Sequence, residues 1–327
     1  MKQYFLPRLR GKSPDFSHVV ALWKQSKRQY IKLSSYSTYC LLADKHITPY
    51  FSRPGKLSEQ EIQAFTDSLF RKGLSIKTVK DINLVLKMIL KYGTKCHFWP
   101  GIAYTIHYPA GLAKKGVEIL SKEDEIRLIT HCASSTSVRD LGLLICLCTG
   151  MRIGEVCALR WSDIDLAHSM IHINKTVQRI YLKRGHSSEY LLCLDTPKTP
   201  SSVRDVPIPG KLSIILDKAR DNASPDAFVL TGGAKPMEPR TYRDYFKKIL
   251  QLLDIPEKRF HALRHTFATR CVESGCDYKT ISAIIGHSSI ATTMNLYVHP
   301  DMTQKRRAQN QMLEYIRRST SANAGLK

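Results

Sequence analysis

Apolar residues recur at helical spacing along the first hundred residues of the chain. Four segments between residues 15 and 100 place apolar side chains three or four positions apart, which is the period of an amphipathic helix. In the last of these segments Val79, Ile82 and Leu86 form one stripe, and lysines lie outside it. We therefore predict a helical domain over residues 15–100, preceded by a basic tail at residues 1–14.

The pattern changes in the rest of the chain. Prolines and glycines interrupt the helical spacing over residues 101–116, which we interpret as a linker. The apolar run LGLLICLC then predicts a buried helix, while alternation at Ile171 and Ile173 predicts a strand, so we expect residues 170–208 to form one small antiparallel sheet. The fold class predicted is mainly α with a small antiparallel β-sheet, and the second domain spans residues 117–302.

Net charge narrows the class of partner. The 327 residues include 50 Lys and Arg against 28 Asp and Glu, a formal net charge of +22. Residues 1–110 carry a net +12 and residues 111–327 a net +10, so the first third has the denser charge. Such density is typical of a domain that holds nucleic-acid phosphates, although charge alone also suits RNA or an anionic membrane.

Cysteine usage and hydropathy point to a compartment. The nine cysteines include no Cys-x-x-Cys pair, and no apolar stretch approaches membrane-spanning length. The N-terminus lacks the apolar core of a secretion signal. We therefore expect a protein of the cytoplasm without a membrane partner.

Polar side chains gather at the ends of short predicted helices near residue 270. His261, Arg264 and His265 fall at positions i, i+3 and i+4, so they share one helical face. Gly286 suits a helix C-cap, and His287 follows it directly. Histidine and arginine side chains at this spacing favour an anionic oxygen centre as their ligand.

The next predicted helix carries a tyrosine. Ile290, Met294 and Tyr297 fall on one stripe of this helix. A lone tyrosine at such a position is usually a packing residue. Its proximity to the histidines and the arginine is what makes a chemical role worth considering.

This stretch resembles the active-site core of the tyrosine recombinases, also called the phage integrase family. The family motif of His-x-x-Arg, then Gly-His, then a tyrosine about ten residues later, is present as His261, Arg264, His287 and Tyr297. Two upstream parts of the motif also occur in the expected order. They are an arginine in a Thr-Gly-Met-Arg turn and a lysine in a predicted hairpin, Arg152 and Lys198.

The resemblance implies a role for each of the main residues. Tyr297 is expected to attack a DNA phosphate and form a 3′-phosphotyrosyl link. Arg152 and Arg264 are expected to grip that phosphate with their planar guanidinium groups. Lys198 is expected to protonate the 5′-hydroxyl leaving group.

Four further side chains are expected to assist. By the same resemblance, His261 and His287 contact phosphate oxygens, and Glu155 orients Arg152 or His261. His265 is expected to have a packing or supporting role. His261 and His265 have the spacing of zinc ligands, but no third ligand is near in the sequence, so we expect neither a metal nor a cofactor.

The resemblance also implies an architecture and partners. A helical core-binding domain and a mixed α/β catalytic domain would form a C-shaped clamp on double-stranded DNA, with Lys77, Lys80, Lys114 and Lys115 near the backbone. The active form would be a homotetramer on DNA, in which residues 303–327 pass a helix to a neighbouring subunit. Accessory DNA-bending or directionality proteins are further possible partners.

Four functions are compatible with this resemblance. We favour integration or excision of a mobile element, because the predicted hairpin between the strands is longer than a minimal Xer-type sheet needs. The alternatives are Xer-type resolution of replicon dimers, relaxation of DNA in the manner of a type IB topoisomerase, and DNA-binding regulation by a protein whose active site is inert.

Overall fold

The computed structural model describes residues 15–52, 57–109, 116–184, 187–197, 200–221 and 223–297, together with residues 302, 305–306, 309–314 and 316–317. Its contacts divide the chain into two compact units. The N-terminal unit consists of residues 1–115 and 178–193, and the C-terminal unit consists of residues 116–177 and 194–327.

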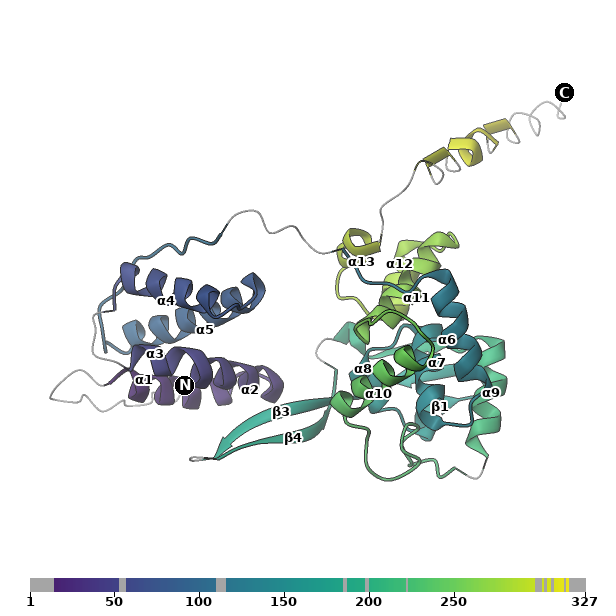
Figure 1. The fold of residues 1–327 in the computed structure, drawn as a ribbon, viewed down its shortest axis with the longest axis horizontal. Coiled ribbons are helices and arrows are strands. Elements are labelled where there is room, and N and C mark those ends of the chain that lie inside the picture. Colours follow the sequence, from purple (N-terminus) through teal and green to yellow (C-terminus); the bar gives the residue numbers. More distant parts are fainter. Residues whose placement is uncertain are drawn as a thin grey trace. The chain divides into compact units, whose positions relative to one another are not determined.

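Helices build the N-terminal unit, as the hydrophobic spacing predicted (Figure 1). A core of apolar side chains that includes Trp23, Phe65 and Leu86 holds the helices together. Lys77 and Lys80 lie on an exposed face of the last helix. The elements are α1 (Phe16–Arg28), α2 (Leu33–Leu42), a π-helical turn (Ala43–Ile47), α3 (Thr48–Phe51), α4 (Glu59–Arg71) and α5 (Ile76–Lys95).

The segment that follows α5 packs back on the helices. The backbone N–H of Thr105 donates to Glu59 Oε1 at 2.8 Å, and that of His107 donates to Gln63 Oε1 at 3.0 Å. Alternate side chains of the segment pack against the core, namely Ile102, Tyr104, Ile106 and Tyr108. The stretch interpreted as a linker, residues 101–116, therefore begins with residues that belong to the N-terminal unit.

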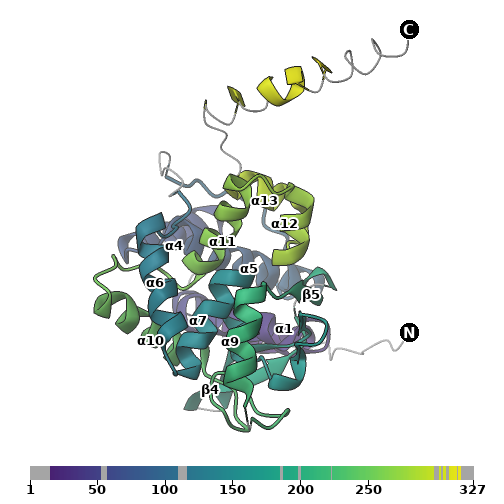
Figure 2. The same cartoon turned by 90° about the vertical axis from the view of Figure 1, so that its right-hand side faces the viewer.

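A buried helix lies at the centre of the C-terminal unit. This helix, α7 (Val138–Thr149), contacts α6 (Lys122–Ser134), α9 (Gly210–Arg220) and α11 (His261–Glu273), as Figure 2 shows. Leu143, Ile145 and Cys146 of α7 are fully buried, which explains the uninterrupted apolar run. The remaining helices of this unit are α8 (Ile153–Cys157), α10 (Pro239–Leu252), α12 (Tyr278–Ile285) and α13 (Ile290–Tyr297), with short 3₁₀ turns at Trp161–Asp163 and Pro200–Ser202.

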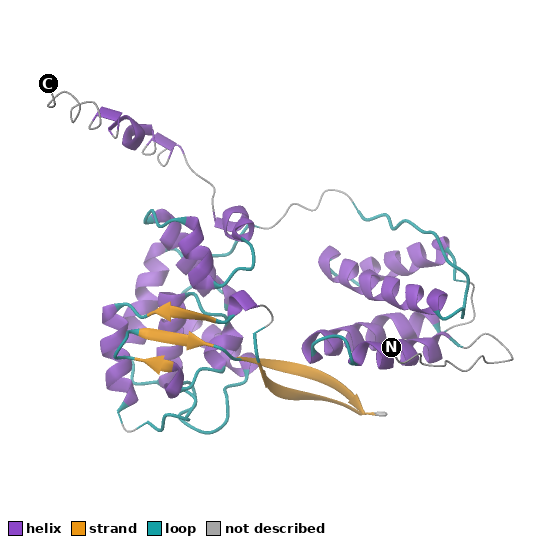
Figure 3. Ribbon diagram, turned by 180° about the vertical axis from the view of Figure 1, so that it is seen from behind, coloured by secondary structure: helices purple, strands orange, loops and turns teal. Residues whose placement is uncertain are grey.

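The strands form two sheets, so the expectation of one sheet over residues 170–208 was wrong (Figure 3). One sheet has the antiparallel order β1 (Ile164–Asp165), β2 (Met170–Ile173), β5 (Arg204–Pro207). The other is a ribbon of β3 (Thr176–Arg184) and β4 (Ser187–Asp195). In the described residues, neither strand of the ribbon pairs with β1, β2 or β5.

Residues 178–193 of the ribbon join the N-terminal unit. There the backbone N–H of Tyr181 donates to Ser37 Oγ at 2.7 Å, and the guanidinium of Arg179 lies 4.1 Å from the centroid of the Tyr190 ring. Within the described residues, no helix has both the length and the apolar character needed to cross a membrane.

Substitution of a glycine in α7 can be used to test how tightly the core is packed. A Cβ atom at Gly142 would lie 2.2 Å from Leu230 Cδ2 and 2.5 Å from Tyr242 Oη. Because overpacking a core costs about 1–3 kcal/mol, Gly142→Ala should lower the free energy of unfolding by roughly that amount in urea denaturation followed by circular dichroism. Gly210→Ala is the control, since nothing lies within 4 Å of its added Cβ. Equal midpoints for the two variants would contradict the prediction.

Candidate active site

A sharp turn between α7 and α8 presents the first arginine. Gly150 ends α7 in the left-handed conformation, with φ of 65°, and its N–H donates to Cys146 O at 2.9 Å. A Cβ atom there would lie 2.6 Å from Phe267 Cδ1, so the turn requires glycine both for its φ and for its close packing. Arg152 follows as the N-cap residue of α8, as the sequence predicted.

Glu155 receives two hydrogen bonds from Arg152. The backbone N–H of Arg152 donates to Glu155 Oε2 at 2.9 Å, and Nη1 donates to Oε1 at 2.7 Å. The Glu155 side chain is 2% exposed, whereas the Arg152 side chain is 33% exposed. Glu155 therefore lies behind Arg152, while Arg152 keeps an accessible edge.

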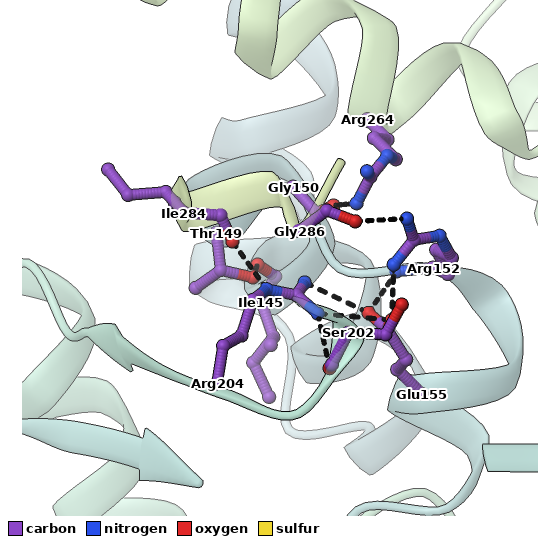
Figure 4. Close-up of polar contacts among 10 residues, drawn as sticks. All are labelled: Ile145, Thr149, Gly150, Arg152, Glu155, Ser202, Arg204, Arg264, Ile284 and Gly286. Atoms are coloured by element: carbon purple, nitrogen blue, oxygen red, sulfur yellow. Dashed lines mark hydrogen bonds and ion pairs between the residues drawn. The ribbon is translucent and has the colours of Figure 1, made fainter. Parts of the chain in front are cut away.

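A second arginine, which sequence reasoning left out of the site, holds the other side of Glu155 (Figure 4). Arg204, at the start of β5, donates from Nη1 to Glu155 Oε1 at 3.1 Å and from Nη2 to Oε2 at 3.0 Å. Burial acts to raise the pKa of the Glu155 carboxyl, but the hydrogen bonds and charge of Arg204, together with Arg152, give a net lowering. The carboxylate is thus ionised between two cations.

The helix that carries the His-x-x-Arg motif supplies the next three side chains. Arg264, on α11, is 1% exposed and donates from Nη1 to Gly150 O at 2.8 Å, which links α11 to the turn before Arg152. His261 begins α11 and keeps an exposed edge. The rings of His261 and His265 meet edge to face with centroids 4.4 Å apart. The predicted common face of α11 is therefore present.

The Gly286 turn brings in His287. Gly286 caps α12 with φ of 66°, and its carbonyl oxygen accepts from Arg152 Nη2 at 2.7 Å. His287 Nδ1 lies 2.9 Å from the Thr293 hydroxyl on α13, and Thr293 is fully buried. The histidine is thus oriented from one side by the turn and from the other by the next helix.

The apolar residues Ile290 and Met294 of α13 do not face the core. They are 43% and 44% exposed, whereas the polar Thr293 is buried. Their common stripe is therefore a surface feature at these two positions. Thr293 is buried because its hydroxyl has a partner in His287, which offsets the cost of removing it from water.

The histidines of this site are neutral at neutral pH. Burial lowers the pKa of His261 to about 4, and the neighbouring charges of His265, Arg264 and Arg152 act in the same direction. Burial and the charges of Arg264 and Arg152 likewise lower the pKa of His287 to about 4. The pKa of His265 is also lowered, first by burial and then by Arg264. An anion bound among these groups would raise the pKa values of the histidines, because a nearby negative charge favours the protonated ring.

Some of the predicted residues cannot be assigned to this cluster. Lys198, Lys114 and Lys115 lie outside the described residues. Tyr297 is the last residue of α13, and the structure describes its backbone but not its side chain. Lys77 and Lys80 belong to α5 of the N-terminal unit, not to this cluster.

Two residues that the sequence did not mark as part of the site contribute to it. Arg204 is close in sequence to the predicted hairpin lysine and resembles an ordinary solvated residue at the end of a strand. No local feature points to its partner Glu155, 49 residues earlier. Thr293 precedes Tyr297 by four residues and thus lies on the same face of α13, which is the one local signal that could have found it.

The arrangement suits one kind of substrate. Two guanidinium groups and two neutral imidazoles converge next to the helix that ends at Tyr297. Guanidinium forks and imidazole N–H groups are good ligands for the oxygens of a phosphodiester. In the described part of the chain, no three His, Cys, Asp or Glu side chains gather in a way that could hold a metal ion. A cluster of this composition suits an enzyme that acts on the phosphodiester groups of a nucleic acid.

Comparison with known proteins identifies the family within this class. The model of the phage integrase family matches residues 118–304, and the chain belongs to that family. It is 30% identical over 271 residues to a protein named tyrosine recombinase XerC-like from Caldanaerobacter subterraneus subsp. tengcongensis, covering 76% of this chain and 68% of the relative. The protein is thus a tyrosine recombinase that breaks and rejoins DNA.

Two more comparisons concern integrases. The chain is 24% identical over 303 residues to the ICEBs1 integrase of Bacillus subtilis, covering 89% of this chain and 80% of the relative. Its fold is similar to that of the Tn1549 transposon integrase in complex with circular intermediate DNA, with a TM-score of 0.68 and 21% identity, covering 90% and 99% of the two chains. The predicted fold class, mainly α with a small antiparallel β-sheet, is confirmed, although the strands form two sheets and not one.

The pKa values of the two site histidines are open to direct measurement. In the DNA-free protein the rings of His261 and His287, with pKa values of about 4, should stay neutral down to pH 5.5, where an ordinary histidine is about nine-tenths protonated. Histidine-selective ¹⁵N NMR measures this, and His261→Gln and His287→Gln assign the signals. Binding of duplex DNA should raise both pKa values, because a phosphate anion favours imidazolium. Ring signals that titrate near pH 6.5 without DNA would contradict the expected effect of burial.

Proposed function

We propose that this tyrosine recombinase integrates and excises a mobile DNA element at specific sites. The observation that carries the proposal is the convergence of Arg152, Arg264, His261 and His287 beside the helix that ends at Tyr297. The similarity to the ICEBs1 integrase over 89% of the chain supports the choice of integration, as does the shared fold with the Tn1549 transposon integrase.

In the proposed reaction the two arginines bind the scissile phosphate. The accessible edge of Arg152 and the guanidinium of Arg264 stabilise the negative charge on the non-bridging oxygens. Neutral His261 and His287 each donate an N–H to the phosphate, which costs less than bringing two imidazolium cations beside two arginines. Fixed donors of this kind need no rearrangement when charge develops in the transition state.

The covalent step then conserves the phosphodiester energy. The Tyr297 oxygen forms a bond to phosphorus as the bond from phosphorus to the 5′-oxygen breaks. The Lys198 ammonium gives its proton to that 5′-oxygen, and a histidine of the site takes the tyrosine proton. Because the phosphotyrosyl bond stores the energy of the broken linkage, the 5′-hydroxyl of another strand can reverse the step without ATP.

DNA binding is assigned to charged residues in both units. Lys77 and Lys80 are exposed on α5, where their ammonium groups can reach backbone phosphates. Lys114 and Lys115, in the segment between the helical and catalytic domains, would add contacts along the duplex. In this proposal residues 15–100 bind the core of the site, residues 117–302 perform the chemistry, and the two form a clamp on DNA in the bacterial cytoplasm.

The tail is assigned to contacts between subunits. Met312, Leu313 and Ile316 are 52%, 59% and 52% exposed, and residues 309–314 are helical. A helix that exposes three large apolar residues gains stability when a neighbouring protomer buries them. We place this exchange in a homotetramer on DNA, as the family resemblance implies, with accessory DNA-bending or directionality proteins as additional partners.

A covalent trapping assay tests the central step. The wild-type protein is incubated in EDTA with DNA that flanks its gene and is then run on a denaturing gel. A slowly migrating protein–DNA band should form, and Tyr297→Phe should lose it completely because phenylalanine lacks the attacking oxygen. Tyr278→Phe, a matched change on α12, should keep the band.

The result also separates the alternatives. Binding of DNA without a band in either wild type or Tyr297→Phe would favour an inert DNA-binding regulator. Cleavage without sequence preference would favour topoisomerase-like relaxation, and cleavage only at sites of a replicon would favour Xer-type resolution. Mapping the nick identifies the target site.

Removal of the tail tests its proposed role. A protein lacking residues 303–327 should still bind a single site with nearly unchanged affinity, because the lysines proposed to contact DNA remain. It should form paired-site complexes at least ten-fold less readily, as judged by native gel shift with one-site and two-site DNA. An equal loss in both assays would argue against subunit exchange.

A further inference from the structure

Arg204 makes an unusually complete set of hydrogen bonds for a residue next to an active site. Its Nη1 donates to Glu155 Oε1 and to Ser202 O, both at 3.1 Å, and its Nη2 donates to Glu155 Oε2 at 3.0 Å. Its Nε donates to Ile284 O. The side chain is 6% exposed, so Arg204 cannot be the group that touches DNA.

These bonds fill the acceptor sites of Glu155. Each carboxylate oxygen of Glu155 accepts once from Arg152 and once from Arg204. A carboxylate offers about four acceptor positions, so Glu155 is saturated and cannot rotate without breaking charged hydrogen bonds. Through Glu155, the position of Arg204 therefore fixes the position of Arg152.

The same pair of arginines holds the end of α12. Arg204 binds the carbonyl of Ile284, and Arg152 binds the carbonyl of Gly286 at 2.7 Å. Cations at a helix C-terminus are favourable because the exposed carbonyl groups carry partial negative charge. A Cβ at Gly286 would lie 3.1 Å from Arg204 Cδ, so this turn also packs directly on Arg204. His287 is the next residue.

We propose that Arg204 is a positioning residue for strand cleavage: its guanidinium joins α8, β5 and the end of α12, so that Arg152 and His287 meet the same phosphate. The inference rests on the proposed function, in which Arg152 and His287 bind the scissile phosphate. It adds a residue that acts only through others and that the family resemblance did not mark.

The planar shape of the guanidinium matters here as much as its charge. Two parallel N–H bonds reach Glu155 while Nε points to Ile284 on the opposite edge. A lysine ammonium is a compact charge with three donors and cannot span both edges. Arg204→Lys therefore keeps the charge and removes the geometry, whereas Arg204→Gln removes both.

The C-terminal unit offers a matched control. Arg270, at the end of α11, is 22% exposed and binds Glu125 Oε2 at 2.7 Å and Leu120 O at 2.9 Å. Like Arg204, it binds both carboxylate and backbone carbonyl oxygens, with Glu273 as a second carboxylate partner. Among the described residues, none of its hydrogen bonds reaches Arg152 or His287. Arg270→Lys should lower thermal stability without a specific effect on cleavage.

The test measures single-turnover formation of the covalent complex on duplex DNA that carries the site mapped by trapping. Arg204→Lys should slow this step roughly 100-fold, the effect of misplacing one preorganised group in a transition state, and change DNA affinity less than three-fold. Arg270→Lys should cleave at the wild-type rate at a temperature where both variants are folded.

Two readouts separate positioning from a general loss of structure. In Arg204→Gln the acidic limb of the rate–pH profile should move to higher pH, because Glu155 loses the partner that keeps it ionised. The double variant Arg204→Lys with Glu155→Gln should be no slower than the slower single variant, since both changes act through one carboxylate. If Arg204→Lys does not fold, Glu155→Gln alone should show the loss of rate with DNA binding kept.

The outcomes also distinguish this inference from the proposed function. Wild-type rates in Arg204→Lys, or additive effects in the double variant, would overturn the positioning role while leaving the recombinase intact. No covalent complex with the wild-type protein, or an undiminished complex with Tyr297→Phe, would instead refute the proposed chemistry.

Discussion

The active region depends on one buried carboxylate. Glu155 is 2% exposed and lies between Arg152 and Arg204, so its charge is buried but fully paired. Removing one partner of such a group leaves an uncompensated charge in the interior, which is far more costly than losing a surface ion pair. The elements that meet here, α8, β5 and α12, are far apart in sequence, and this carboxylate gives them a common point of attachment.

The net charge of Arg152, Glu155 and Arg204 makes the site attractive to an anion. One carboxylate between two guanidinium groups leaves a net positive charge, and the more exposed Arg152 carries it toward solvent. The site histidines do not add to this charge, because burial and the arginines lower their pKa values to about 4. The site is therefore attractive to an anion without the strong mutual repulsion that two further cations would create.

The sequence predicts features that depend on neighbouring residues or on a motif of several closely spaced residues. The buried helix α7 followed from its apolar run, and the turn before Arg152 followed from the family motif. The role of Arg204 could not be predicted, because its partners Glu155 and Ile284 are distant in sequence and its local sequence is that of an ordinary strand end. The division into two sheets depended on which strand pairs with each edge of β2, and no local pattern specifies such pairing.

The apolar stripe of α13 is not its buried face. Ile290 and Met294 are exposed, and among the described side chains of this helix it is Thr293 that is buried, in contact with His287. A helix of eight residues has little stability of its own, and a single buried polar contact adds only modestly to it. The arginines that would bind phosphate, by contrast, are fixed through a buried carboxylate and through backbone carbonyls. Charged hydrogen bonds to buried partners constrain a side chain more strongly than one neutral contact does. In the proposed reaction, the groups that meet the phosphate would thus be preorganised independently of α13.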